Sequence, residues 1–489
     1  MNKYKNYLPF LFYGIAVFVG LLLFFTFISP LTIYDADDWL YIYELRKPIP
    51  RIHVWNPTRV FPEAFMPLVS YFGALIINPL INDYFRSLSL AHGLFASIVI
   101  TLYFVEFPLM FYKRKIATAP SSIAYGLLFL LLHFISHIMK GYDNYFLLGA
   151  TNVTCFYFYV LAVMINASLV MHFISYGGPK AWFKNSSIIH KLIVAIWAYF
   201  AIFSNLFSSV VLATYIGTEL LLTLIKEIKS KEFNLKRYCY SNWLNLLLIM
   251  LWFSANLIET TGGRARDFHG NIFINIPLAF VYTLGSLVVI NLFILIFEIV
   301  VFYKWKKINK QLPEIAIYFL VGMGLQLLYI ILLCATSEVT YAFGTQVTIA
   351  HFFYIFTALI VCLNQLIAHD KRYKKLPLIL CGTILLLLFR PGRILYPYNY
   401  SYLSYEQCDA LMNDIISQFK TAEANGENEI ILVLPKYDVE GNWPLSTSLV
   451  GDRMSTALKR HRILDTYITV KDIKLSDEKN KQFNISPER

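Results

Sequence analysis

The chain has 489 residues, of which 57% are hydrophobic and only 15% are charged, and its formal net charge is +11. So few charged side chains cannot cover the surface of a soluble protein of this size, so the composition excludes a soluble enzyme and predicts an integral membrane protein. The basic residues occur in short clusters between apolar stretches. This pattern indicates positive-inside topology, and no nucleic-acid partner is expected.

The first apolar stretch runs from about Tyr7 to Leu31, after Lys3 and Lys5. It lacks a cleavage site of small residues, so we expect a retained anchor with a cytoplasmic amino terminus. The sequence Tyr34-Asp35-Ala36-Asp37-Asp38-Trp39-Leu40-Tyr41 follows directly and places three carboxylates at the membrane boundary. Crowded carboxylates there lose hydration and repel one another unless a proton, a cation or a substrate compensates, so this segment is predicted to be a functional site.

The region from about Ser29 to Arg86 is predicted to be one long external loop. Its apolar piece, Ala64 to Leu80, is not interpreted as a crossing, because a crossing would place Lys113-Arg114-Lys115 outside, against the charge rule. We expect this piece to form short helices that lie in the membrane interface or enter it partway. Prolines interrupt the loop at Pro48, Pro50, Pro57, Pro62, Pro67 and Pro79.

Further apolar stretches are long enough to cross about 30 Å of hydrocarbon, and the basic clusters between them assign each loop to a side. The stretch 191–225 begins and ends beside a basic cluster, so it must cross twice, with a turn at Ser204 to Ser209. Together with the first span, these stretches predict about eleven membrane helices. The other stretches are approximately 87–112, 119–139, 151–175, 242–259, 274–303, 314–334, 346–368 and 376–394.

The composition changes near Pro391 from continuous apolar residues to a mixture of charged and apolar ones. We therefore divide the chain into a transmembrane domain, residues 1–394, and an external domain, residues 395–489. Hydrophobic spacing in the second domain predicts two helices and two strands, and hence a small α/β unit. The helices are expected at Tyr405 to Ala424 and Met454 to His461, and the strands at Glu429 to Leu434 and Tyr467 to Ile473.

This order of elements resembles the GT-C superfamily of membrane glycosyltransferases. Asp37-Asp38-Trp39-Leu40-Tyr41 is similar to the D-[DE]-x-x-Y pattern of its aminoarabinose transferases and protein O-mannosyltransferases. The W-W-D motif of the oligosaccharyltransferase branch is absent, and Asn442-Trp443-Pro444 is the nearest string, which disfavours asparagine glycosylation. The resemblance implies an all-α polytopic membrane protein with a small external α/β domain. It also implies sugar transfer from a polyprenyl-phosphate donor on the outer face.

Such a reaction needs a base, because the acceptor hydroxyl must lose its proton as it attacks the anomeric carbon. Asp37 is the first candidate for this base. Asp38 is expected to orient Asp37 or to bind a divalent cation, Mg²⁺ or Mn²⁺, together with it, and no other cofactor is expected. Asp35 is a weaker third candidate. The alternative for this cluster is a set of solvated acidic residues without a catalytic role.

The leaving phosphate also needs cations that stabilise its developing charge. Arg264 and Arg266 lie in an external loop against the positive-inside trend, which favours this role, although contact with lipid headgroups is an alternative. The other candidate substrate-binding residues are Tyr41 of the motif, Arg59 in the first loop, Asp143 in the next external loop, which is about as well explained as a turn residue, and Arg393 after the last span.

These features combine into one functional expectation, a hexosyl- or pentosyltransferase of the bacterial plasma membrane. It would move a sugar from a polyprenyl-phosphate donor to a cell-envelope glycan, either a polysaccharide or a teichoic-acid-like acceptor, with inversion at the anomeric carbon. One alternative is a polymerase that joins lipid-linked repeat units and relies more on external arginines. Another is a flippase or transporter of lipid-linked sugars, although related halves and charged groups within the spans, which are common in transporters, are not seen.

Overall fold

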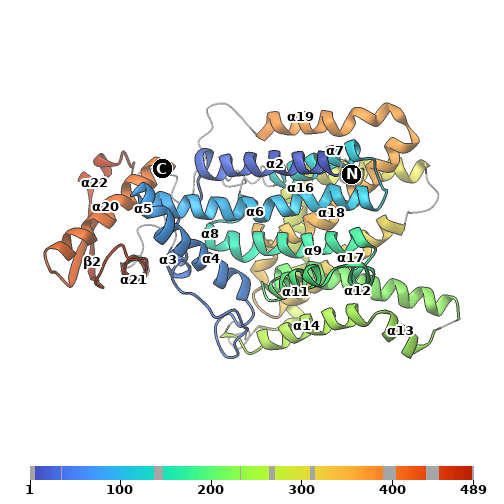
Figure 1. Cartoon of the computed structure of the whole chain (residues 1–489), viewed down its shortest axis with the longest axis horizontal. Helices are drawn as coiled ribbons and strands as arrows, with labels where there is room; N and C mark the ends of the chain where they lie inside the picture. The colour runs from blue at the N-terminus through green and yellow to red at the C-terminus, as the bar shows by residue number, and fades with distance from the viewer. Residues whose placement is uncertain are drawn as a thin grey trace.

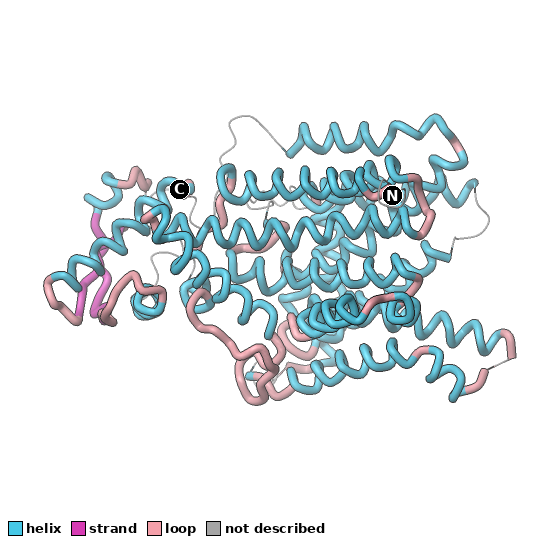
Figure 2. Tube along the Cα trace, in the orientation of Figure 1, coloured by secondary structure: helices cyan, strands magenta, loops and turns pink. Residues whose placement is uncertain are grey.

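The computed structural model describes residues 6–34, 36–136, 147–231, 233–263, 270–308, 314–388, 403–436 and 451–486. This part of the chain is mostly helical and contains one two-stranded sheet. Long helices pack side by side as a bundle, and the sheet lies with its own helices at one end of that bundle (Figures 1 and 2). The amino terminus lies toward the opposite end (Figure 1).

Within the described ranges, seven helices are long and apolar enough to cross a membrane, and a bent pair, Leu235–Ser241 with Trp243–Glu259, would make an eighth. The chain therefore has the helices of a multi-pass membrane protein, while the expected count of about eleven spans stays a prediction. The seven are Leu8–Ile28, Val60–Ile81, Tyr84–Lys113, Val153–Tyr176, Leu206–Lys229, Ile317–Ala335 and Thr345–His369. Shorter apolar helices are Ala119–Ile135, Ile188–Ile202 and Ile272–Leu287.

The helix bounds follow the apolar stretches of the sequence closely. The stretch 191–225 forms two helices, as predicted, with the break at residues 203–205. Asn205 ends this break, because its side chain accepts a hydrogen bond from the Phe207 amide at 3.0 Å and so caps the second helix. The helices after the first loop are α6 (Tyr84–Lys113), α7 (Ala119–Ile135), α11 (Ile188–Ile202), α12 (Leu206–Lys229), α13 (Leu235–Ser241), α14 (Trp243–Glu259), α16 (Ile272–Ile308), α17 (Glu314–Ala335), α18 (Thr345–His369) and α19 (Leu376–Leu388).

One continuous helix forms the centre of the bundle. It consists of α8 (Val153–Cys155), the π-helical η5 (Phe156–Leu161) and α9 (Ala162–Tyr176). Within its apolar stretch of 18 residues, 94% of the residues are buried inside the protein. Its long run of apolar residues on all sides is what a helix surrounded by others requires. The start of this helix faces the loop that follows the first span, so it is the support on which the candidate site is built.

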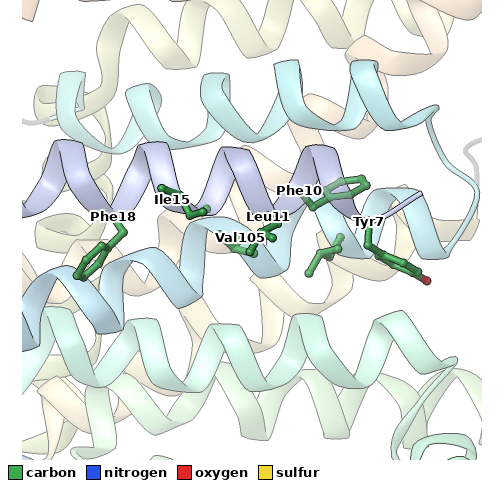
Figure 3. A pocket seen from close by; sticks show the side chains of 8 residues that line it. Tyr7, Phe10, Leu11, Ile15, Phe18 and Val105 are labelled. Atoms are coloured by element: carbon green, nitrogen blue, oxygen red, sulfur yellow. The ribbon is translucent and has the colours of Figure 1, made fainter. Parts of the chain in front are cut away.

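The first helix, α2 (Leu8–Leu23), continues as η1 (Phe24–Ile28) and lies beside α6. A shallow apolar cavity of about 400 Å³ lies between these two helices, and its labelled side chains are hydrophobic apart from the Tyr7 hydroxyl (Figure 3). Leu11 and Ile15 in this cavity are at least half exposed, as expected for residues that face lipid. We assign no chemistry to it.

The segment between α2 and α6 gathers at the end of the bundle near the sheet (Figure 1). It contains α3 (Ala36–Tyr41), α4 (Val60–Phe72), η2 (Gly73–Ile77) and α5 (Asn78–Ile81). Gly73 lets η2 lie directly on α6, because a Cβ there would be 2.9 Å from the Ser87 carbonyl oxygen. Val60–Ile81 is a candidate span by length and composition. Its interpretation as interfacial helices stays a prediction.

The C-terminal unit contains the two helices and two strands that its spacing predicts, and a third helix that was not predicted. The predicted elements are α20 (Tyr405–Ala424), β1 (Glu429–Pro435), α21 (Asp452–Arg460) and β2 (Thr469–Ser476), and the third helix is α22 (Asp477–Gln482). The two strands pair in parallel, with Glu429 opposite Thr469, so the connection between them must cross over the sheet, and it carries α21. Ser404 begins α20 with a capping box that includes Gln407.

His461, which directly follows α21, joins the C-terminal unit to the bundle. Its Nδ1 lies 2.7 Å from the hydroxyl of Tyr84 at the start of α6, and its Nε2 lies 3.1 Å from the carbonyl oxygen of Ile42. The ring also contacts the Tyr71 ring edge to face, with centroids 4.7 Å apart. Arg460 adds a cation–π contact, 5.0 Å from the Tyr43 ring. The C-terminal unit therefore packs on the first loop.

Acidification is expected to weaken this contact. Burial lowers the pKa of His461 from 6.5 to about 4, so the folded protein holds the imidazole neutral. The contribution of neutral His461 to the free energy of unfolding is therefore complete above pH 6.5. It is lost as the pH falls from 6.5 toward 4, by up to about 3 kcal/mol. The measurement is the thermal midpoint of purified protein between pH 4 and 7.5, compared with that of His461→Phe.

The parent should lose more stability than His461→Phe over this range. The comparison is necessary because Asp409 titrates nearby with the opposite effect. Burial and the neighbouring Asp83 raise the pKa of Asp409 to about 6, so its protonation favours the folded state as the pH falls. Equal pH dependence of parent and variant would contradict the assignment to His461.

Candidate functional site

The carboxylates of Asp37 and Asp38 face different surroundings. The Asp37 side chain is 64% exposed, and its Oδ1 lies 3.3 Å from Nη1 of Arg453 on α21. Asp38 is fully buried. One of its oxygens accepts hydrogen bonds from the amide and hydroxyl of Thr154 on α8, at 2.8 and 2.6 Å, and the other accepts from the Tyr34 amide at 3.3 Å.

Asp38 therefore has a structural role, because its hydrogen bonds with Thr154 hold the start of α3 against the central helix. Asp37 is left as the accessible carboxylate of the pair. Among the described residues there is no group of three or more His, Cys, Asp or Glu side chains that could hold a metal ion. A divalent cation shared by Asp37 and Asp38 therefore stays a prediction.

Asp38→Ala is expected to destabilise the protein by about 3 kcal/mol, because it leaves buried donors of Thr154 without their acceptor. Thr154→Val should cost about 1 kcal/mol, since it removes only the hydroxyl and keeps the amide donor. The measurement is the thermal midpoint in detergent at neutral pH. Equal midpoints for parent and Asp38→Ala would show that Asp38 does not fasten α3.

Arg59 is the second notable side chain of this region. Only 6% of the residue is exposed, and its guanidinium lies 5.1 Å from the Phe158 ring centroid and 5.9 Å from that of Tyr159, both on η5. Within the described part of the chain, this guanidinium makes no hydrogen bond or ion pair. Burial alone would lower the pKa of Arg59, but Tyr159 and Glu259 raise it by more, so the side chain stays cationic.

Arg46, another buried arginine of the same loop, has partners on both terminal nitrogens of its guanidinium. It forms an ion pair with Glu63 at 2.8 Å and donates to the carbonyl oxygens of Asn56 and Pro57 at 2.6 and 2.5 Å, while its Nε has no partner among the described residues. These contacts fix the path of the loop. Of these two buried arginines, Arg59 is the one whose guanidinium is available to an anion.

Tyr41 is the last residue of the acidic motif and contacts the same aromatic ring as Arg59. Its ring contacts Phe158, with centroids 4.8 Å apart, and its hydroxyl accepts a hydrogen bond from the Asn56 side chain at 3.1 Å. The Phe158 ring therefore contacts both Tyr41 and Arg59. Of the sequence-predicted residues, Asp38, Tyr41 and Arg59 are brought together around the start of the central helix.

The loop after α14 begins at the same place. Glu259 accepts hydrogen bonds from the amide and hydroxyl of Thr58, at 3.1 and 2.5 Å. Gly263 fits only because it lacks a side chain, since a Cβ there would lie 2.5 Å from the Trp55 ring. Gly263, the last described residue before Arg264, thus lies beside the first loop. Arg264 and Arg266 themselves lie outside the described residues, as do Asp35, Asp143 and Arg393.

Sequence reasoning missed several residues of this site. Thr154, Glu259 and Arg453 each contact the first loop from a distant part of the chain. The one available signal was Glu259, a carboxylate at the end of an apolar stretch and five residues before Arg264. Arg59 and Tyr41 meet at the rings of η5, whereas the accessible carboxylate of Asp37 faces Arg453 on α21. An accessible carboxylate can take a proton from a hydroxyl, and a buried cation can hold an anion.

Comparisons with protein-family models, curated proteins and solved structures found no match to this chain.

Proposed function

We propose that this protein is a membrane glycosyltransferase that moves a sugar from a polyprenyl-phosphate donor to a cell-envelope glycan on the outer face of a bacterial plasma membrane. The observation that carries the proposal is the buried guanidinium of Arg59, which has no hydrogen-bonded partner in the described part of the chain and lies near the acidic motif. A desolvated cation that has charge interactions with Glu259 and Glu63 but no hydrogen-bonded partner among the described residues is suited to an anion that arrives with a substrate.

In the proposed reaction, the acceptor hydroxyl attacks the anomeric carbon while its proton passes to the Asp37 carboxylate. The new glycosidic bond forms as the bond between that carbon and the phosphate oxygen breaks. The electron pair leaves with the polyprenyl phosphate, whose negative charge Arg59 stabilises. A single displacement of this kind inverts the anomeric configuration. Tyr41 and Phe158 would contact the sugar.

The test is direct transfer from a polyprenyl-phosphate-linked radiolabelled sugar to an envelope glycan, with purified protein in vesicles. We expect one sugar added per acceptor site and polyprenyl phosphate released. A parallel reaction with a chelator tests the divalent cation. Absence of transfer from a panel of pentose and hexose donors, with envelope composition unchanged in a deletion strain, would contradict the proposal.

A polymerase of lipid-linked repeat units is the second candidate, because Arg59 would suit a leaving lipid diphosphate equally well. The same assay separates the two. A polymerase lengthens the glycan and releases a lipid diphosphate, whereas a transferase adds a side-chain sugar at constant length.

A further inference from the structure

A second polar site lies at the other end of the bundle. A cavity of about 910 Å³ opens between the ends of α6, α9, α12 and α17. The length of α6 separates this cavity from the C-terminal unit. Arg114 in the cavity wall follows the last residue of α6, and Tyr84 at the start of α6 contacts His461 of the C-terminal unit. A helix of 30 residues, as α6 is, spans roughly 45 Å.

The charged side chains in the wall of this cavity are mostly basic. They are Arg114, Lys226 and Lys229, with Glu219 as one carboxylate. Lys226 and Lys229 are three residues apart in the last turn of α12 and so share a face. Within the described ranges, none of the three basic side chains makes a hydrogen bond or an ion pair. Arg114 has a charge interaction with Glu219, and the hydrogen-bond donors of all three side chains are available to a ligand.

The end of α9 leaves room for the guanidinium of Arg114. Gly177 ends this helix with a φ of +86°, and a Cβ there would lie 3.3 Å from Nη1 of Arg114. A larger residue would be strained in that conformation and would press on the arginine. The glycine thus allows Arg114 to lie against the end of α9, across the opening from the lysines of α12.

The rest of the wall is largely apolar. Seven aliphatic or aromatic side chains contribute to it, namely Ile174, Tyr215, Leu222, Ile225, Ile317, Tyr318 and Phe319. A small hydrophilic anion would gain nothing from this surface, whereas a hydrocarbon chain would bury it. Cations combined with apolar walls at the end of a helix bundle match an anionic amphiphile, and basic pockets between membrane helices bind anionic lipid headgroups.

We propose that this cavity binds an anionic phospholipid from the leaflet at this end of the bundle. Arg114, Lys226 and Lys229 hold the phosphate, and the apolar wall takes the first part of the acyl chains. The site is separate from the one around Arg59 and does not depend on the proposed transfer reaction.

The test compares lipids by thermal stabilisation of the full-length protein in detergent. Dioleoylphosphatidylglycerol should raise the midpoint, while dioleoylphosphatidylcholine and inorganic phosphate should not. The triple variant Arg114→Gln, Lys226→Gln, Lys229→Gln should bind phosphatidylglycerol at least tenfold more weakly. A matched triple variant at the same end, Lys115→Gln, Lys180→Gln, Lys184→Gln, has the same charge change outside the cavity and should bind like the parent.

Thr223→Trp is a second variant that keeps every charge but fills the cavity, because Thr223 is part of its wall. It should also lose lipid binding, which separates the site from general charge attraction. Equal weakening in the two triple variants, or full binding by Thr223→Trp, would overturn the proposal. Stabilisation by inorganic phosphate that the cavity variants lose would overturn the lipid assignment in favour of a soluble phosphate ligand.

Discussion

Asp37→Asn is expected to slow sugar transfer by about 10²- to 10⁴-fold, the usual contribution of a positioned base. The amide keeps the size of the side chain but cannot accept the proton of the acceptor hydroxyl. Because the Asp37 side chain is 64% exposed, the substitution should leave the thermal midpoint unchanged. The measurement is the initial rate of transfer from a saturating polyprenyl-phosphate donor, together with donor binding.

Arg453→Gln is the control for this variant. It removes the ion pair with Asp37 but keeps the carboxylate, and an exposed pair of this kind contributes at most about 1 kcal/mol to stability. Its turnover should stay within a few-fold of the parent. If both variants lose transfer to the same extent, Asp37 acts as a docking group for the C-terminal unit and its assignment as the base is wrong.

Arg59→Gln is expected to lower the turnover by about 10²- to 10³-fold, as the loss of a group that stabilises developing negative charge commonly does. Binding of a short-chain polyprenyl phosphate should weaken as well. Arg59→Lys should recover little, because an ammonium group lacks the planar fork that binds two phosphate oxygens. Calorimetric titration of the lipid phosphate and the transfer rate are the two measurements.

Arg46→Gln is the matched control, since it removes a second buried guanidinium from the same loop. It leaves Glu63 and two carbonyl oxygens without their donor, so it should destabilise the protein by about 3 to 5 kcal/mol. Arg59→Gln breaks no side-chain hydrogen bond among the described residues and loses only cation–π and charge contacts, so it should cost clearly less stability than Arg46→Gln. A large loss of stability with normal lipid binding would show instead that Arg59 has a structural role.

Hydropathy predicted the helices well because membrane helices are long and uniformly apolar. The break between α11 and α12 followed from loop charges, and the elements of the C-terminal unit followed from their spacing. Val60–Ile81 shows the limit of this reasoning. Its length suits a crossing, but its place relative to a membrane depends on what packs around it, as the contact of Gly73 with Ser87 illustrates.

The candidate site was predictable only in part. The acidic motif marked the position, but nothing local distinguishes the exposed Asp37 from the buried Asp38. That difference arises from Thr154, which is 116 residues further along the chain than Asp38. Likewise, Arg46 and Arg59 look alike in the sequence, and only the folded loop supplies partners to one and not to the other.

The contact between Asp37 and Arg453 joins residues 416 positions apart, and this separation sets an order for biosynthesis. At 5 to 20 residues per second, a ribosome needs roughly 20 to 80 s to synthesise the intervening chain. During that interval the first loop is already present without the unit that later packs on it. The packing of the C-terminal unit on the loop is therefore a late product of assembly, and a nascent chain interrupted before Arg453 would lack the ion pair with Asp37.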